Sequence, residues 1–270
     1  MSATFSSRIS TDKMPLLFLG HGNPMNAIEE NQFVHGFRTV AKELPLPTAI
    51  LCVSAHWETR GTRLTAMEQP RTIHDFGGFP RELYEVQYPA PGSPTLATTT
   101  KDTVHPTPVE LDYDWGLDHG AWSVIKHLYP EANVPVVQLS LDVLKKPREH
   151  YELAKELTSL RRKGVLIIGS GNMVHNLRMV DWHNVNTVDY AFDWAQEARS
   201  NMNEFILNNN HQALIDYHAN GKAFRMAIPT PEHYLPLLYV LALKEKDEAV
   251  TLFNDHPVGG SLTMTSVKIN

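Results

Sequence analysis

Histidines stand at the ends of the apolar segments of this chain. Two apolar runs of strand length end at His21 and His56, and each of these histidines has small residues beside it. A third run, 164–171, leads through a short loop to His175. Neutral imidazole is the commonest metal-ligating side chain, and several imidazoles that meet at one point are typical of a metal site. The pattern therefore predicts a metal centre with nitrogen ligands.

The segment Thr-Pro-Glu-His (230–233) provides a further candidate ligand. Its order is typical of a helix N-terminus, with Thr230 as the cap and proline at the first helical position, ahead of an apolar helix over 234–243. The positive end of the helix dipole disfavours imidazolium, so we expect His233 to stay neutral and able to bind a metal. Glu232, beside it, is a rival ligand.

A fifth candidate, His119, lies in a turn that we expect to open a helix over 121–129.

The sequence lacks several motifs that are typical of other chemistry. The Gly-Ser-Gly loop before His175 lacks the spacing of a nucleotide-binding loop, and the chain has no G-x-S-x-G elbow and no H-E-x-x-H pair. Nitrogen-rich ligands with open positions suit hydrolytic zinc or non-haem iron(II), and the residues leave both choices open.

The elements that must position these histidines alternate between strands and helices. Helical spacing begins at Pro147, with a stop at Gly164, and begins again at Asp189. The last segment, 259–270, alternates weakly and predicts a final edge strand. Apolar runs without polar alternation predict buried, mostly parallel strands at 16–20, 49–54, 134–139 and 165–169.

This alternation predicts an α/β fold, a single domain with a mostly parallel central sheet flanked by helices. Because the carboxyl ends of parallel strands meet at one edge of a sheet, we expect the metal site there. The segment 68–118, rich in proline and glycine, is too long for a simple connection and predicts a functional loop. We expect its part around 74–80 to border the metal site, with Phe76 and Phe79 offering flat apolar faces.

Composition narrows the classes of partner. The formal net charge of −6 argues against nucleic acid and against an anionic membrane as partners. The one cysteine, Cys52, lies inside an apolar strand, so no disulfide forms within the chain, as is typical of a cytoplasmic protein. Residues 1–13 are polar and predict a flexible N-terminal tail, which leaves 14–270 as the folded domain. We expect a monomer or a small homo-oligomer.

Motifs of one family run in order across nearly the whole chain. They are Phe-Leu-Gly-His-Gly-Asn-Pro-Met (18–25), Val-Ser-Ala-His-Trp (53–57), Thr-Ile-His-Asp-Phe-Gly-Gly-Phe-Pro (72–80), Tyr-Pro-Ala-Pro-Gly-Ser-Pro (88–94), Leu-Asp-His-Gly-Ala-Trp (117–122), Gly-Ser-Gly-Asn-Met-Val-His-Asn-Leu-Arg (169–178) and Pro-Thr-Pro-Glu-His-Tyr-Leu-Pro-Leu-Leu-Tyr (229–239). Together they resemble the class III extradiol ring-cleavage dioxygenases, in the branch of the 4,5-DOPA dioxygenases and especially its bacterial members.

The resemblance implies a cytosolic oxidoreductase that uses one mononuclear metal to insert both atoms of O2 into a catechol. Ring opening then occurs beside the two hydroxyls, not between them. The implied substrates are dioxygen and L-DOPA, cleaved at its 4,5 bond, or a related catechol. The implied cofactor is Fe(II) for turnover, with Zn(II) as the alternative ion in the protein as isolated.

By motif, the resemblance also assigns the histidines. His21, His56 and His233 match the metal ligands. His175 matches a residue at the same centre that is either a fourth ligand or an acid/base, and His119 matches a histidine that moves protons beside the metal ligands. Other class III branches complete the site with a glutamate, whereas a histidine fills that place here.

Two other functions fit the same histidines. A zinc-dependent hydrolase would use metal-bound water as its nucleophile. A non-catalytic protein on the same scaffold would only bind a metal or a ligand. Consumption of oxygen on addition of a catechol distinguishes a dioxygenase from both.

Overall fold

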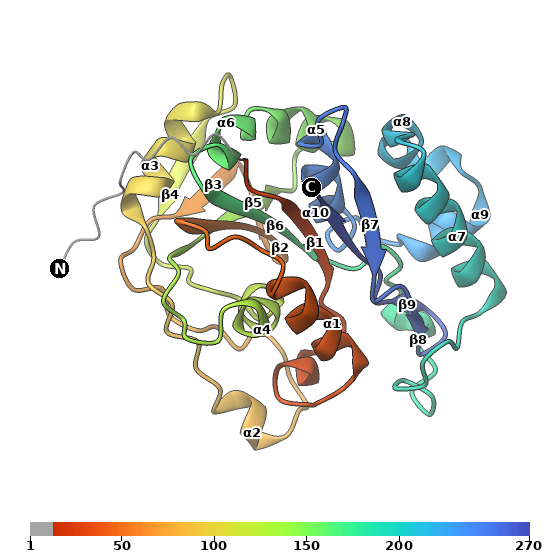
Figure 1. The fold of residues 1–270 in the computed structure, drawn as a ribbon. Helices are drawn as coiled ribbons and strands as arrows, with labels where there is room; N and C mark the ends of the chain where they lie inside the picture. Colours follow the sequence, from red (N-terminus) through yellow and green to blue (C-terminus); the bar gives the residue numbers. More distant parts are fainter. Residues whose placement is uncertain (1–12) are drawn as a thin grey trace.

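A computed structural model describes residues 13–270, and its centre is a sheet of eight strands (Figure 1). The four middle strands are parallel and lie in the order β5-β2-β6-β1. They are β1 (Leu16–Gly20), β2 (Ala49–Thr59), β5 (Val136–Asp142) and β6 (Val165–Gly171). The predicted α/β class, a single domain with a mostly parallel sheet, is confirmed, and each of the predicted buried strands exists.

Shorter strands extend this sheet on both sides. β3 (Thr62–Thr65) pairs antiparallel with β5 and parallel with β4 (Val109–Asp112). On the other side, β10 (Ser266–Ile269) lies antiparallel between β1 and β7 (Val250–Phe253). The edges of the sheet are therefore β4 and β7.

The C-terminal segment corrects one prediction. The expected edge strand over 259–270 is an interior strand, because β10 has partners on both sides. Val267 and Ile269 are fully buried beside β1, which an edge position would not require. The start of the segment instead forms β9 (Leu262–Thr263), which pairs with β8 (Pro257–Val258) outside the main sheet.

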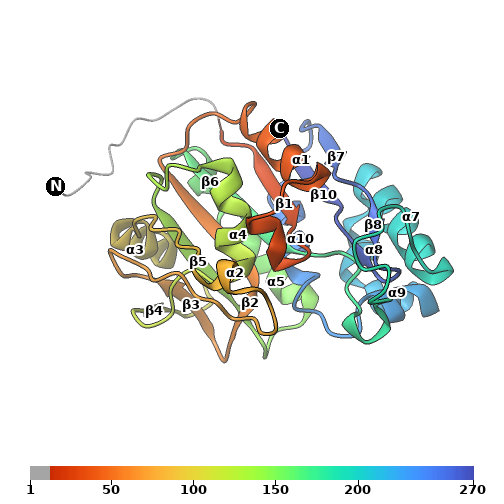
Figure 2. The same cartoon turned by 90° about the horizontal axis from the view of Figure 1, so that it is seen from below.

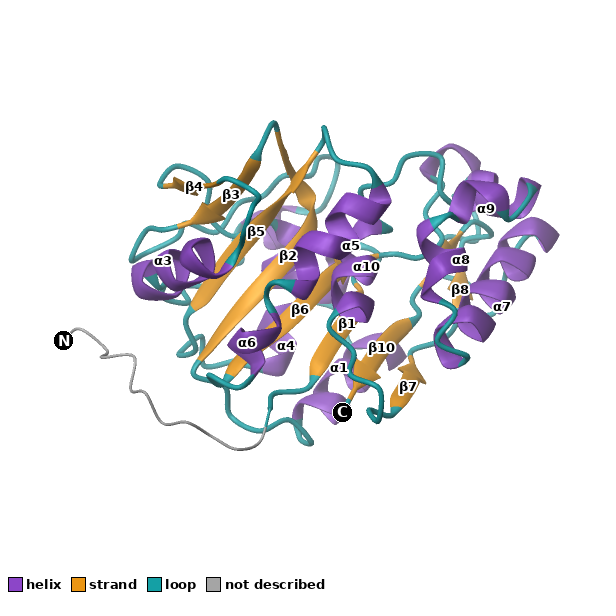
Figure 3. Cartoon of the chain, turned by 90° about the horizontal axis from the view of Figure 1, so that it is seen from above, coloured by secondary structure: helices purple, strands orange, loops and turns teal. Residues whose placement is uncertain are grey.

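Helices cover both faces of the sheet, so alternate residues of a central strand enter different cores. In β1, Leu16 and Phe18 enter one core, and Leu17 and Leu19 enter the other. The core of Leu17 is covered by α1 (Gln32–Ala41), α2 (Arg81–Tyr84) and α4 (His119–Leu128) (Figure 2). The core of Leu16 is covered by α5 (Pro147–Lys155), α6 (Thr158–Arg161) and α10 (Leu235–Ala242) (Figure 3).

The remaining helices pack on the core that contains Leu16. They are α3 (Pro94–Thr103), α7 (Asp193–Leu207), α8 (His211–Ile215) and α9 (Lys222–Ala227). Short 3₁₀ helices lie at η1 (Pro24–Ala27), η2 (Leu177–Met179) and η3 (Tyr217–Ala219).

Two predicted helix boundaries need correction. The helix expected from Pro147 to a stop at Gly164 is divided into α5 and α6, which are separated by a turn. The helix expected to open at Asp189 begins at Asp193 instead. Asp189 has a φ of 61°, outside the helical region, and its carboxylate accepts a hydrogen bond from the Nδ1 of His256 (2.7 Å).

The predicted N-terminal tail, 1–13, lies outside the described residues except for Lys13. The Lys13 ammonium is 2.7 Å from an Oε2 of Glu245, which holds it at the surface near the end of α10. Within the described part of the chain, no helix is both long and apolar enough to cross a membrane.

Candidate metal centre

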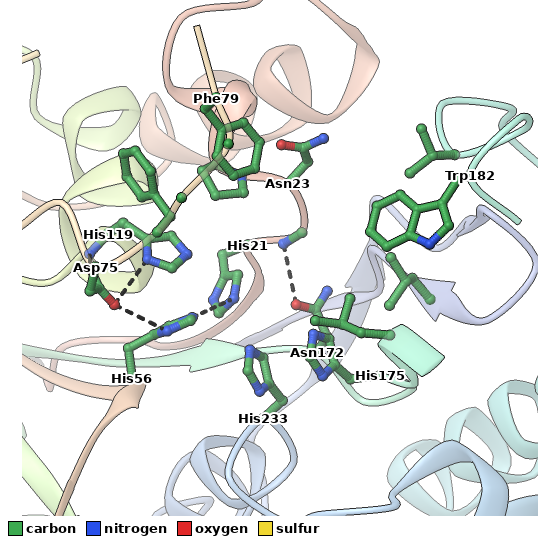
Figure 4. A pocket seen from close by; sticks show the side chains of 18 residues that line it. His21, Asn23, His56, Asp75, Phe79, His119, Asn172, His175, Trp182 and His233 are labelled. Atoms are coloured by element: carbon green, nitrogen blue, oxygen red, sulfur yellow. Dashed lines mark hydrogen bonds and ion pairs between the residues drawn. The ribbon is translucent and has the colours of Figure 1, made fainter. Parts of the chain in front are cut away.

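The parallel strands β1 and β2 deliver His21 and His56 to one edge of the sheet. His21 follows β1 directly, and its backbone N–H donates to the carbonyl of Gly171 at the end of β6 (3.1 Å). His56 lies on β2 beyond Ser54, where the pairing with β6 ends and the register with β5 shifts. The irregular stretch of β2 thus places His56 beside His21 (Figure 4).

His233 reaches the same point from near the other end of the chain. It lies in the turn before α10 and not in the helix, and Thr230 donates to Glu232 Oε1 (2.9 Å) instead of capping the helix as predicted. The carbonyl of His233 accepts the backbone N–H of Asn172 (2.9 Å), just after β6. A Cβ on Gly171 would lie 2.1 Å from that carbonyl, so glycine is needed for this approach.

The three imidazole rings surround one point (Figure 4). Their centroids are 5.1 Å apart for His21 and His56, 5.0 Å for His56 and His233, and 5.2 Å for His21 and His233. The Nε2 atoms of His21 and His56 are 3.3 Å apart. Two nitrogens that are each roughly 2.1 Å from a shared tetrahedral ion lie about 3.4 Å apart, so this spacing fits a metal.

An oxygen atom holds the Nδ1 of each of the three rings. The Nδ1 of His21 is 3.0 Å from the Ser170 hydroxyl, which itself donates to the carbonyl of Gly120. The Nδ1 of His56 is 3.2 Å from Asp75, and that of His233 is 3.1 Å from Glu232. Because these oxygens accept from Nδ1–H, each Nε2 keeps its lone pair for a metal. The residues therefore fit a metal ion with three nitrogen ligands.

His119 lies at the start of α4, next to His56. The helix begins two residues earlier than predicted because the carboxylate of Asp118 caps it, accepting from the backbone N–H of Ala121 (3.0 Å). The His119 and His56 rings have centroids 3.9 Å apart. A Cβ on Gly120 would lie 2.7 Å from the His56 ring, so this glycine lets the helix end approach the site.

His175 lies on the other side of His233. It comes four residues after β6, and its backbone N–H donates to the carbonyl of Ala227 (2.9 Å). The His175 and His233 rings are stacked, with centroids 3.6 Å apart and an angle of 9° between their planes. It forms a group of possible ligand atoms with Glu232 and His233, whereas His21, His56 and His233 form a separate group without it.

Burial determines the protonation of most of these rings. Burial, with the neighbouring imidazoles, lowers the pKa of His21 and of His233 well below the ordinary value, so both rings are neutral at neutral pH. Burial is therefore the largest cause of the neutral state of His233. Burial also acts to lower the pKa of His56, but Asp75 and Asp118 outweigh it and hold that pKa above its usual value.

The histidines open onto a cavity of about 480 Å³, which is within the range of pockets for small ligands. Residues 75–79 form one wall, so the predicted position of this loop beside the site is confirmed. Trp182 lies across the cavity from Asp75 (Figure 4), and its side chain is 66% exposed. Among the described residues that line the cavity, none is lysine or arginine.

No pattern in the sequence predicts a role for Asp75 or Ser170, and Glu232 is predicted only as a rival ligand. In the structure these residues hold the outer nitrogens of the ligand rings. The only sequence signal for Asp75 is its place within the family motif 72–80. No local pattern shows that its side chain reaches the histidines. Its distance along the chain from His56 and His119 hid the contact.

A parallel α/β sheet that gathers three imidazoles beside an aromatic-walled cavity is the arrangement of a metal-dependent enzyme for small molecules. Comparison with known proteins narrows this class. Residues 15–263 match the family described as the catalytic LigB subunit of aromatic ring-opening dioxygenase. The chain belongs to this family and is an oxidoreductase of the extradiol type. Its substrates are therefore a small aromatic molecule and dioxygen.

Individual relatives agree with the family. A protein of Escherichia coli K12 named 4,5-DOPA dioxygenase extradiol is 45% identical over 271 residues, which cover 97% of this chain and 96% of that protein. A Beta vulgaris protein of the same name is 34% identical over 93% of this chain and 94% of its own length. A crystal structure of an uncharacterized protein from Escherichia coli K12 superimposes with a TM-score of 0.81 at 41% identity, covering 96% of this chain and 100% of that one.

Proposed function

We propose that residues 14–270 form a catalytic domain that cleaves L-DOPA or a related catechol at the 4,5 bond, with a single Fe(II) held by His21, His56 and His233. The observation that carries this proposal is the set of three Nε2 atoms whose rings are held from behind by Ser170, Asp75 and Glu232. An Fe(II) ion bound there would supply the redox chemistry that zinc, which has no accessible redox change, lacks.

The protein's own groups would then bind the ring and move its protons. Burial lowers the pKa of His175 to about 4, so at neutral pH this ring is uncharged and has a nitrogen lone pair that can accept a hydrogen bond from a catechol hydroxyl. His119 lies on the opposite side of the ligand rings, beside Asp75. We assign His119 the handling of a second proton and His175 the role of acid/base, not of a fourth ligand.

Aromatic side chains would hold the substrate ring. Phe76 contacts Phe79 and His119 in edge-to-face geometry, with centroids 5.4 Å apart in both pairs. These flat apolar surfaces suit a catechol, and the exposed Trp182 marks the open end, toward which a long side chain such as that of L-DOPA would extend.

The test is oxygen uptake by protein reconstituted anaerobically with Fe(II), with formation of a yellow product on addition of a catechol. We expect uptake with L-DOPA and with simple catechols, and none with zinc-only protein. Full activity of iron-free zinc protein would contradict the redox role. Ester or amide hydrolysis without oxygen uptake would instead support the zinc hydrolase.

The charges at the cavity predict a preference among catechols. Asp75 and Glu232 lie close to the site, and none of its described lining residues is a cation. A carboxylate fixed on the ring would therefore be buried without a partner, which costs at least about 1.4 kcal/mol, or tenfold. We expect kcat/KM for 3,4-dihydroxybenzoate to be at least about tenfold below that for 4-methylcatechol. Equal values would show that the substituent reaches solvent or a cation.

Truncation of the aromatic wall should weaken substrate binding. We expect Phe76→Ala to raise the KM for 4-methylcatechol about tenfold, because one face of the ring loses its aromatic contact. The control is Phe253→Ala, which removes a partly buried phenylalanine of the same core that does not line the cavity. That variant should lower the Tm and leave KM unchanged. If Phe76→Ala behaves in the same way, the loop is only scaffold.

A further inference from the structure

Both carboxylate oxygens of Asp75 face nitrogen atoms of neighbouring residues. Oδ1 accepts the backbone N–H of His119 (2.8 Å). Oδ2 lies 3.0 Å from the Nδ1 of His119 and 3.2 Å from the Nδ1 of His56 (Figure 4). One oxygen therefore faces two imidazole rings, and the other faces a backbone donor that cannot change its character.

This geometry selects one tautomer for both rings. An ionised carboxylate accepts hydrogen bonds and donates none. A ring that turns Nδ1 toward Oδ2 is stabilised when Nδ1 carries the proton, which leaves the lone pair on Nε2. The Nε2 of His56 is the atom that faces His21 at 3.3 Å, where the metal would lie. Burial raises the pKa of Asp75, but the contacts with His119 and His56 outweigh it and hold that pKa well below its usual range.

The loop that carries Asp75 is fastened to the segment before α4. The backbone N–H of Ile73 donates to the carbonyl of Leu117 (2.7 Å), and that of Leu117 donates to the carbonyl of Arg71 (2.9 Å). The indole of Trp122, on α4, donates to the carbonyl of Ile73 (2.8 Å). Asp75 is therefore fixed relative to His119, and the position of the loop keeps its carboxylate next to the rings of His56 and His119.

We propose that Asp75 is a positioning residue that sets the tautomers of His56 and His119 together, so that His56 presents an Nε2 lone pair to the metal and His119 presents an Nε2 able to take a proton. The metal role rests on the proposed function. The loop 75–79 thereby completes the metal site in addition to forming a wall of the cavity.

Substitution by asparagine should be worse than removal of the side chain. In Asp75→Asn, the amide must place its NH2 group either against the backbone N–H of His119 or against the two rings. The backbone N–H of His119 cannot become an acceptor. Each ring can make its Nδ1 an acceptor by moving the proton from Nδ1 to Nε2. A His56 with a protonated Nε2 cannot bind a metal through that atom. In Asp75→Ala no group enforces this tautomer, and either nitrogen remains available.

Glu232 offers a matched control on another ligand. Its Oε1 accepts from the Nδ1 of His233 and from the hydroxyl of Thr230, and no described contact commits its second oxygen. Glu232→Gln can therefore keep an acceptor toward His233 and preserve its tautomer. Asp75→Asn and Glu232→Gln each remove one negative charge near the site. Asp75→Asn changes the tautomer of a ligand ring, whereas Glu232→Gln preserves it.

The experiment measures Zn²⁺ affinity of the metal-free, full-length protein by competition with a fluorescent chelator. We expect Asp75→Asn to weaken Zn²⁺ binding about 100-fold and Asp75→Ala about 10-fold. Loss of the hydrogen-bond partner of a metal ligand typically weakens metal binding within this range. Glu232→Gln should weaken binding by less than about tenfold, because the neutral amide can keep the hydrogen bond to His233 but without the strength that the charge gives it. If all three variants lost the same Zn²⁺ affinity, only the charge would matter and the proposal would be wrong. A lower Zn²⁺ affinity for Asp75→Ala than for Asp75→Asn would also overturn it.

A second measurement needs no variant at Asp75. Long-range ¹H–¹⁵N spectra of the metal-free wild-type protein, at mildly alkaline pH, report which nitrogen of each histidine carries the proton. We expect Nδ1–H for His56 and His119, with His56→Gln used to assign the signal of His56. Nε2–H at His56 would overturn the proposal. Neither readout depends on turnover, so failure to cleave catechols would count against the proposed function and not against this role of Asp75.

Discussion

Replacement of His233 by alanine is expected to give a folded protein that retains no metal and cleaves no catechol. The ring supplies one of three nitrogens at the centre, so the loss of metal affinity should exceed the 10–100-fold typical of a partner behind a ligand. Turnover should fall by more than the roughly 10²–10⁴-fold that accompanies loss of an acid/base. The fold should survive because the backbone carbonyl of residue 233, not its ring, bonds to Asn172.

The measurements are metal content after dialysis, oxygen uptake and thermal unfolding. His127→Ala is the control, since His127 is another buried histidine that does not line the cavity, with its Nε2 2.8 Å from the carbonyl of Asn26. This variant should lose stability and keep its metal. A His233→Ala protein that still holds one ion per chain with unchanged affinity would remove His233 from the ligand set.

The sequence predicted the fold and the identity of the histidines from local signals. Buried parallel strands are continuous apolar runs, and β1 matches its predicted range of 16–20 without change. The rule that carboxyl ends of parallel strands share an edge then brought His21 and His56 together. Local patterns also selected His233, His175 and His119 as candidates, and the family motifs assigned their roles. The structure places all three around the same cavity.

Features that depend on tertiary contacts were not predictable in this way. The weak alternation of 259–270 is compatible with an edge strand, and only the position of β7 makes β10 an interior strand. Asp189 and Thr230 have the residue types of helix starts, but their side chains bond elsewhere. Asp75 was hidden for the same reason, because its partners come from β2 and α4 and no spacing rule connects them.

Replacement of His175 by phenylalanine is expected to leave the metal in place and reduce turnover by about 10²–10⁴-fold, as is typical of a lost acid/base. Phenylalanine keeps a flat ring against His233, on which His175 stacks at 3.6 Å, so the ligand should keep its position. It removes both ring nitrogens and with them the capacity to accept a proton from the catechol.

The readouts are the affinity for Zn²⁺, kcat and KM, measured for the same preparation. Unchanged metal affinity with a lower kcat and a nearly unchanged KM would establish His175 as the acid/base. Loss of the metal would make it a fourth ligand, and full turnover would exclude it from both roles. We expect the first result, because His21, His56 and His233 form a group of possible ligand atoms without His175, which groups with Glu232 and His233 instead.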